Sequence, residues 1–216
     1  MGDAPSHAFL YPFLYEEEAN EGAPVLEEVQ RSSLQKCREV VELRRRFLEE
    51  QEDVLLGAAA AMAERFRAGG RLLTFGCGGS ATDALDAAHD FASPPDGRRA
   101  LPALSLAADV AVITAVANDV GFDKVFLRQL ISYGRAGDIA LGISTSGNSA
   151  SLVEGFRQAR RQGMLTVGLL GYDGGEAARS GMLDHALVIR ADYVPRIQEA
   201  QATVYHALRD LVEMML

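Results

Sequence analysis

The sequence lacks the features that mark secreted, membrane-spanning and disulfide-stabilised proteins. It has only two cysteines, Cys37 and Cys77, and their positions show no disulfide framework. A reducing cytoplasm is therefore the expected compartment. No apolar run reaches the roughly 18 residues that a membrane-spanning helix needs. No basic segment precedes the apolar residues near the N-terminus, so we expect no secretory signal and no association with a membrane.

Basic residues are also few. The chain has 21 Lys and Arg against 30 Asp and Glu, which gives a net charge of −9 at pH 7. This balance provides no general positive field for a phosphate backbone, so we expect no direct binding of nucleic acid. What is present is an ordinary globular composition: 216 residues, 48% of them hydrophobic, are enough for one large domain with a buried core.

The first third of the chain has a helical character. Residues 1–24 form an N-terminal extension with an acidic run at 16–18, which we interpret as an arm or a short helix. Residues 24–68 are rich in Ala, Leu, Glu, Arg and Gln, with apolar residues near helical spacing. They predict one or two long helices that end at Gly69 and Gly70. We assign residues 25–216, this helical segment included, to a single domain.

From residue 71 onward, short apolar runs alternate with helical stretches. This alternation predicts an α/β fold of three layers, in which helices flank both faces of a parallel sheet. The predicted strands are 71–75, 103–106, 139–143, 165–170 and 186–189, and the predicted helices are 80–92, 109–133, 149–162, 174–180 and 196–215.

Two turns at strand ends have the composition of anion-binding loops. Residues 76–80 read GCGGS after the first strand, and residues 144–149 read STSGNS after the third. Hydroxyls and free backbone N–H groups at a helix N-terminus bind anions, and ligands of such sheets lie beyond the carboxyl ends of the strands. Neither turn is a Walker A loop or a complete dinucleotide fingerprint. Ordinary capped turns are the alternative for each loop, but two such loops in one sheet favour a phosphate site.

Four segments carry a family resemblance: GCGGSATDALDAAHDFA, LPALSLAADVAVITAVANDVGFDKVF, GRAGDIALGISTSGNSASLVEGFRQARRQGMLTVGLLGYDGG and PRIQEAQATVYHALRDLVE. In order and spacing they resemble the sedoheptulose-7-phosphate isomerases, the phosphoheptose isomerases of the sugar isomerase (SIS) domain superfamily. The resemblance implies a flavodoxin-like SIS domain and a homotetramer whose active sites are shared between subunits. It also implies conversion of sedoheptulose 7-phosphate to D-glycero-D-manno-heptose 7-phosphate, often with zinc.

The resemblance assigns roles to residues of both turns and of two helices. The implied phosphate-binding residues are Ser80, Ser144, Thr145, Ser146 and Ser149, with Cys77, Gly78 and Gly79 in the same first turn. Asn118 and Asp119 would line the sugar site. The implied catalytic pair is Asp90 and His206, and the implied metal ligands are Asp86, Asp90, Gln198 and His206, of which Gln198 also contacts substrate.

Three positions in the implied site depart from the family pattern. The family usually has a His four residues before a Glu where this chain has Asp86 and Asp90, and an Asn where it has Cys77. Aspartate is one methylene shorter than glutamate, and a displacement of about 1 Å can cost about 10²-fold in rate. A set of three oxygens and one nitrogen still admits zinc, and also manganese or magnesium.

Less specific interpretations remain open for these residues. Asp86 and Asp90 also fit a solvated helix face, His206 an interface histidine, and Cys77 a reactive thiol. We therefore weigh the isomerase hypothesis against a non-catalytic SIS-domain tetramer that binds a replication initiator protein or senses a sugar phosphate.

Overall fold

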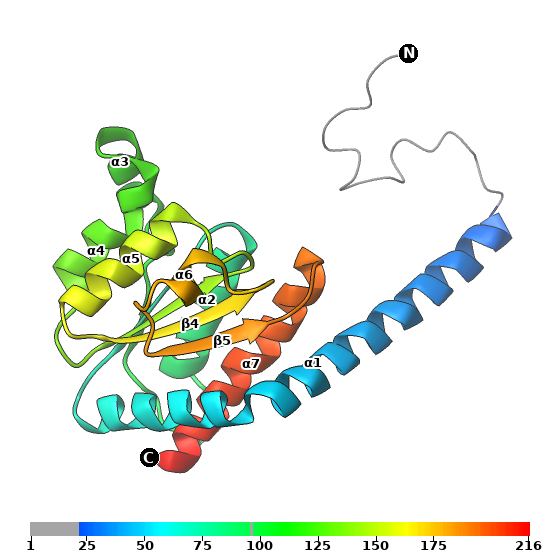
Figure 1. Cartoon of the computed structure of the whole chain (residues 1–216), viewed down its shortest axis with the longest axis horizontal. Helices are drawn as coiled ribbons and strands as arrows, with labels where there is room; N and C mark the ends of the chain where they lie inside the picture. Colours follow the sequence, from blue (N-terminus) through cyan, green and yellow to red (C-terminus); the bar gives the residue numbers. More distant parts are fainter. Residues whose placement is uncertain (1–21, 96) are drawn as a thin grey trace. The chain divides into compact units, whose positions relative to one another are not determined.

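The computed structural model describes residues 22–95 and 97–216. Most of the predicted extension lies outside the described residues, and only its last three positions belong to the first helix. The chain divides into two compact units, one up to Arg38 and one from Glu39 to Leu216. The second unit contains the sheet and every candidate site residue (Figure 1).

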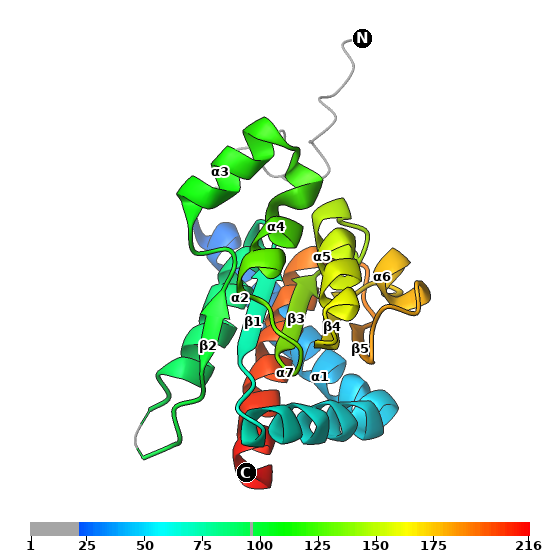
Figure 2. The same cartoon turned by 90° about the vertical axis from the view of Figure 1, so that its left-hand side faces the viewer.

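Five parallel strands form one sheet in the order β2-β1-β3-β4-β5 (Figure 2). The strands are β1 (Leu72–Gly76), β2 (Ala103–Ser105), β3 (Ile139–Ser144), β4 (Leu165–Gly171) and β5 (His185–Ile189). All residues of β1, β3 and β4 are buried, as expected for near-continuous apolar runs in a sheet that is covered on both faces. The predicted three-layer parallel fold is confirmed.

Each face of the sheet has its own hydrophobic core. On one face, α1 (Gly22–Arg67), α2 (Gly79–Ala92) and α7 (Val194–Met215) pack through side chains such as Met62, Phe91 and Leu208. On the other face, α4 (Val125–Tyr133), α5 (Ala150–Arg161) and α6 (Gly175–Arg179) contribute side chains such as Phe126 and Phe156. Figure 2 shows α4 and α5 in front of the sheet and α7 behind it.

The predicted helix over residues 109–133 was wrong. The structure divides it into α3 (Val110–Asp119), a short 3₁₀ helix (Phe122–Lys124) and α4. The break falls at Gly121, whose φ of 133° is open to glycine but not to an L side chain. Although α3 is rich in Val and Ala, none of its residues is buried.

A kink in α1 closes one edge of the sheet. Gln51 leaves helical geometry with φ −137° and ψ 19°. Its side-chain oxygen accepts a hydrogen bond from the backbone N–H of Val188 at 2.9 Å, and its amide donates to the carbonyl of the same residue. The exposed edge of β5 is thereby paired, which blocks strand addition at that position.

None of the helices within the described ranges is long and apolar enough to cross a membrane.

Candidate active site

The two predicted anion loops lie side by side at the point where the strand order reverses. β1 and β3 are neighbours, with Gly76 in register with Ile143, so the turns that follow them leave the sheet at the same place. Cys77 Sγ lies 3.3 Å from Ser151 Oγ and 3.8 Å from Ser149 Oγ, and these two hydroxyls are 3.0 Å apart. The loops therefore form one polar surface.

The glycines of the first turn leave space for another part of this chain. A Cβ on Gly79 would lie 2.0 Å from Nε2 of Gln198, and a Cβ on Gly76 would lie 2.4 Å from the carbonyl oxygen of Ser80. The absence of a side chain at Gly79 thus allows the Gln198 amide of α7 to lie against the N-terminus of α2. The turn accommodates its own backbone and a neighbouring helix in addition to any anion.

A buried glutamine connects α7 to the serine-rich loop. The Nε2 of Gln201 donates to the carbonyl oxygen of Ser144 at 3.2 Å and to that of Leu169 at 3.1 Å, and the side chain is fully buried. Ser144 also uses its hydroxyl to accept from the backbone N–H of Gly147 at 3.1 Å. These bonds fix the start of the loop relative to α7.

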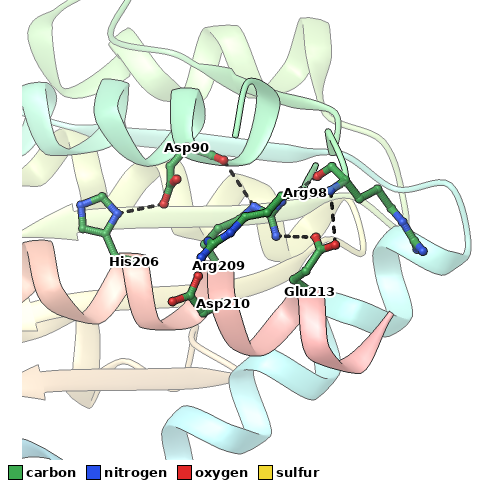
Figure 3. Close-up of polar contacts among 7 residues, drawn as sticks. Asp90, Arg98, His206, Arg209, Asp210 and Glu213 are labelled. Carbon is green, nitrogen blue, oxygen red and sulfur yellow. Dashed lines mark hydrogen bonds and ion pairs between the residues drawn. The ribbon is translucent and has the colours of Figure 1, made fainter. Parts of the chain in front are cut away.

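Side chains of α2 and α7 bring two carboxylates to one imidazole. The Nδ1 of His206 lies 2.9 Å from Asp90 Oδ2, and its Nε2 lies 3.7 Å from Asp86 Oδ2. Figure 3 shows Asp90 and His206 facing each other across the two helices. The Asp90 side chain is mostly buried, whereas those of Asp86 and His206 are more than half exposed. A carboxylate beside a protonated Nδ1 accepts a hydrogen bond from it and orients the ring, which is an arrangement suited to proton transfer.

Tyr205 supplies a permanent hydrogen-bond donor to this group. Its hydroxyl donates to Asp86 Oδ2 at 2.6 Å, while its ring is buried. Burial, followed by the hydrogen bond to Asp86 and the charges of the nearby aspartates, raises the pKa of Tyr205 far above its usual range. The phenol therefore keeps its proton at neutral pH.

Asp83, one turn before Asp86 on α2, brings a third carboxylate. Its Oδ2 is buried and has no hydrogen-bond partner in the described chain. Burial and the charge of Asp86 raise the pKa of Asp83 to about 6.

Comparison with known proteins identifies the family. The SIS domain family matches residues 37–171. A phosphoheptose isomerase of Roseiflexus is 41% identical over 82% of this chain and 89% of the relative, and that of Pelobacter propionicus is 48% identical over 73% and 83%. The structure of the phosphoheptose isomerase from Neisseria gonorrhoeae superposes with a TM-score of 0.80 at 33% identity, covering 86% of this chain and 99% of that one.

The chain belongs to the phosphoheptose isomerase family. The structure gathers most of the residues to which the family resemblance assigned a role, in two adjoining groups. The two loops form one group, with the Gln198 amide of α7 against Gly79, and α2 with α7 brings together Asp86, Asp90 and His206 as the other.

Two residues of the family pattern stand apart from these groups within one chain. Asn118 and Asp119 are exposed at the end of α3, where the amide of Asn118 donates to Asp119 Oδ1 at 2.7 Å. In the described part of the chain, neither side chain contacts Asp90 or His206. Figure 2 shows α3 standing beyond the end of the sheet, beside α4.

Three polar residues of the site, Asp83, Gln201 and Tyr205, were not predicted from the sequence. For the two residues of α7 a signal was present, because Gln201, Tyr205 and Arg209 follow Gln198 at spacings of 3, 7 and 11 residues. That is the spacing of the buried face of a helix. Polar side chains repeated along a core-facing stripe mark a buried polar network.

The donor groups suit a cation chemically. Among residues 22–95 and 97–216, no three His, Cys, Asp or Glu side chains already have the spacing of a metal site. However, Asp86 and Asp90 lie beside one imidazole, and Asp83 lies near Asp86 and Tyr205. In the described chain, no Lys or Arg side chain forms an ion pair with any of these three carboxylates. The buried Asp83 oxygen also lacks a partner. Uncompensated carboxylates of this kind are favourable when a cation is bound.

We expect Asp83→Asn to stabilise the metal-free protein at pH 7. The folded-state pKa of about 6 lies above the unfolded value of 3.8, so the cost of the charge is absent below about pH 4 and is complete above about pH 6. The shift corresponds to at most about 3 kcal/mol, and solvent screening at a half-buried position reduces it to about 1–2 kcal/mol.

Urea unfolding with a chelator at pH 4 and pH 7 measures this effect. The gain from Asp83→Asn should appear at pH 7 and vanish at pH 4. Asp53→Asn, at an exposed position of α1, serves as the control. An equal gain at both pH values would contradict the assignment of the effect to charge burial.

Proposed function

We propose that this protein is an aldose–ketose isomerase that converts sedoheptulose 7-phosphate to D-glycero-D-manno-heptose 7-phosphate. The observation that carries the proposal is the contact of 2.9 Å between Asp90 and His206. It occurs in a chain that is 41–48% identical to phosphoheptose isomerases over at least 73% of its length in the two relatives compared above. A pair of side chains that can transfer protons is therefore present in a chain whose relatives are named for this reaction.

The reaction needs a proton to move between neighbouring carbons. In the proposed mechanism, the Asp90 carboxylate takes a proton from C1 of the ketose, the electron pair forms a C1–C2 double bond, and the electrons of the C2 carbonyl bond move to its oxygen. His206 moves a proton from the oxygen on C1 to the oxygen on C2. The C1 carbonyl bond then forms as the electrons of the C1–C2 double bond take the proton back from Asp90 at C2, which leaves the aldehyde at C1. The hydrogen bond between Asp90 and His206 orients both groups before substrate arrives.

The phosphate of the substrate belongs in the loops at the ends of β1 and β3. Hydroxyls of Ser80, Ser144, Thr145, Ser146 and Ser149, together with Cys77 and the backbone of Gly78 and Gly79, make up this part of the proposal. No Lys or Arg lies within either loop. Neutral donors at helix N-termini bind a phosphate through directed hydrogen bonds and the helix dipole. Binding at the distant phosphate fixes the carbonyl end of the sugar near Asp90.

A divalent cation, with zinc as our first choice, forms a further part of the proposal. Asp86, Asp90, Gln198 and His206 would hold it, as the resemblance implies, and the unpaired Asp83 oxygen supports a positive charge in this region. Three oxygens and one nitrogen also suit manganese or magnesium. When bound, such a cation polarises the substrate oxygens and stabilises charge on them.

Removal of the cation is expected to lower kcat by about 10²-fold, since a Lewis acid contributes several kcal/mol to charge stabilisation. Metal analysis of the purified protein should find about one divalent ion per chain, and activity should return when zinc or manganese is added after chelation. A protein that contains no metal and is fully active in chelator would disprove this part of the proposal.

A homotetramer with shared active sites completes the proposal. Asp86 and His206 open to solvent, α3 has no buried residue, and Asn118 and Asp119 lie apart from the rest of the site. A second copy that placed its α3 beside α2 and α7 would cover the apolar helix and supply the missing pair. Light scattering during size-exclusion chromatography measures the mass of the assembly.

We also place the activity in the cytoplasm, where Cys37 and Cys77 would stay as free thiols.

A coupled assay for the aldose phosphate tests the function directly. The wild-type protein should turn over sedoheptulose 7-phosphate well above the level of Asp90→Asn and His206→Ala variants. Turnover no higher than that of these variants, with intact phosphosugar binding, would instead support the sensor or the initiator-binding protein. The comparisons do not favour either alternative, because the relatives of 30% identity or more that we compared are phosphoheptose isomerases.

A further inference from the structure

Tyr205 lies at the boundary between the hydrophobic core and the aspartates of α2, namely Asp83, Asp86 and Asp90. The residue is only 3% exposed, and its ring packs against the imidazole of His206 with 4.6 Å between ring centroids and 55° between planes. The hydroxyl reaches out of this packing to Asp86 Oδ2 at 2.6 Å. A short hydrogen bond from a hydroxyl to a carboxylate is among the stronger hydrogen bonds in proteins.

This hydrogen bond restrains a side chain that is otherwise mobile. Asp86 is more than half exposed, and its other neighbour is the His206 ring, 3.7 Å away. An exposed aspartate in a helix samples several rotamers, whereas the buried phenol fixes one carboxylate oxygen at a defined position. The second oxygen of Asp86 has no hydrogen-bond partner in the described chain.

We propose that Tyr205 is a positioning residue for the cation site, because its hydroxyl holds Oδ2 of Asp86 and leaves the other oxygen for a divalent cation. The inference rests on the cation site of the proposed function. Side chains that bind a metal are generally held in place by hydrogen bonds from outer groups, and the Tyr205 hydroxyl is such a group for Asp86.

Tyr205→Phe removes the hydroxyl and keeps the packed ring. The matched control is Thr203→Val, which removes a hydroxyl from an exposed position of the same helix, where it bonds to the carbonyl of Glu199. Titration of chelated, metal-free protein with Mn²⁺ or Zn²⁺ gives the metal affinity, and titration with inorganic phosphate reports on the loops. We expect Tyr205→Phe to weaken metal binding by about 10–100-fold and to leave phosphate binding unchanged. Thr203→Val should change neither.

A double-mutant cycle with Asp86→Asn tests whether Tyr205 acts through Asp86. Asp86→Asn should weaken metal binding by itself, and adding Tyr205→Phe should then weaken it by less than twofold, because the oriented ligand is already lost. Equal metal affinity of Tyr205→Phe and wild type would overturn the inference, as would the same loss in both backgrounds. Phosphate binding shows that each variant is folded.

The cation site and the isomerase reaction are tested separately in the same preparations. A wild-type protein that binds neither Mn²⁺ nor Zn²⁺ overturns the cation site and the role of Tyr205 together. Turnover of sedoheptulose 7-phosphate by that protein would still support the isomerase.

Discussion

Replacing Asp90 by Asn is expected to lower kcat for the isomerisation by about 10²–10⁴-fold, the usual contribution of a positioned general base. The amide keeps the size of the side chain and still offers an oxygen to His206 Nδ1. In the unmodified protein that nitrogen lies 2.9 Å from a carboxylate oxygen of Asp90. KM should change by less than about threefold, because the phosphate loops bind substrate without Asp90. Steady-state kinetics with sedoheptulose 7-phosphate separates the two parameters.

The neighbouring residue provides the control for this prediction. His89 is exposed and directly precedes Asp90 on α2, so its side chain points about 100° away from that of Asp90 around the helix axis. His89→Ala should retain wild-type kcat. His206→Ala should be about as slow as Asp90→Asn, and the double variant little slower, because residues that act as a unit are not additive. Wild-type kcat in Asp90→Asn would remove Asp90 from the mechanism.

The periodicity of the sequence was sufficient to predict the sheet. Strands such as β3 are continuous apolar runs bounded by glycine and polar residues, and their helices begin close to the predicted positions. The error over residues 109–133 has a local cause. Val, Ala, Phe and Leu on both sides of Gly121 favour helix, and the positive φ at that single glycine overrides them.

The candidate site was predictable where it depended on strand ends and not where it depended on helix packing. Parallel strands bring their carboxyl ends together, so the loops after β1 and β3 had to meet. The family resemblance brought Asp90 to His206, although 116 residues separate them. The position of Asn118 and Asp119 relative to the site is not determined by one chain, because α3 has no buried face to fix it.

The buried side chain of Arg209 on α7 fixes the backbone of α2 at Asp90. Arg209 is fully buried, and its guanidinium donates to the carbonyl of Asp90 at 3.3 Å, the carbonyl of Arg99 at 2.6 Å and the carboxylate of Glu213 at 2.8 Å (Figure 3). It also lies over the ring of Phe91, 5.5 Å from the centroid. Its packing against α2 holds the turn that carries Asp90.

Arg209→Met is therefore expected to lower the free energy of unfolding by about 2–4 kcal/mol, because the buried guanidinium is a charged donor to the carbonyl groups of Asp90 and Arg99. Methionine fills much of the volume but leaves Glu213 and two carbonyl groups without their donor. Arg98→Met is the matched control, because the Arg98–Asp210 pair is exposed on both sides and contributes at most about 1 kcal/mol. Urea unfolding at pH 7 measures both. If the two variants lost equal stability, the guanidinium of Arg209 would not be what holds Asp90 in place, and the position of the proposed base would depend on the apolar contacts of α2 alone.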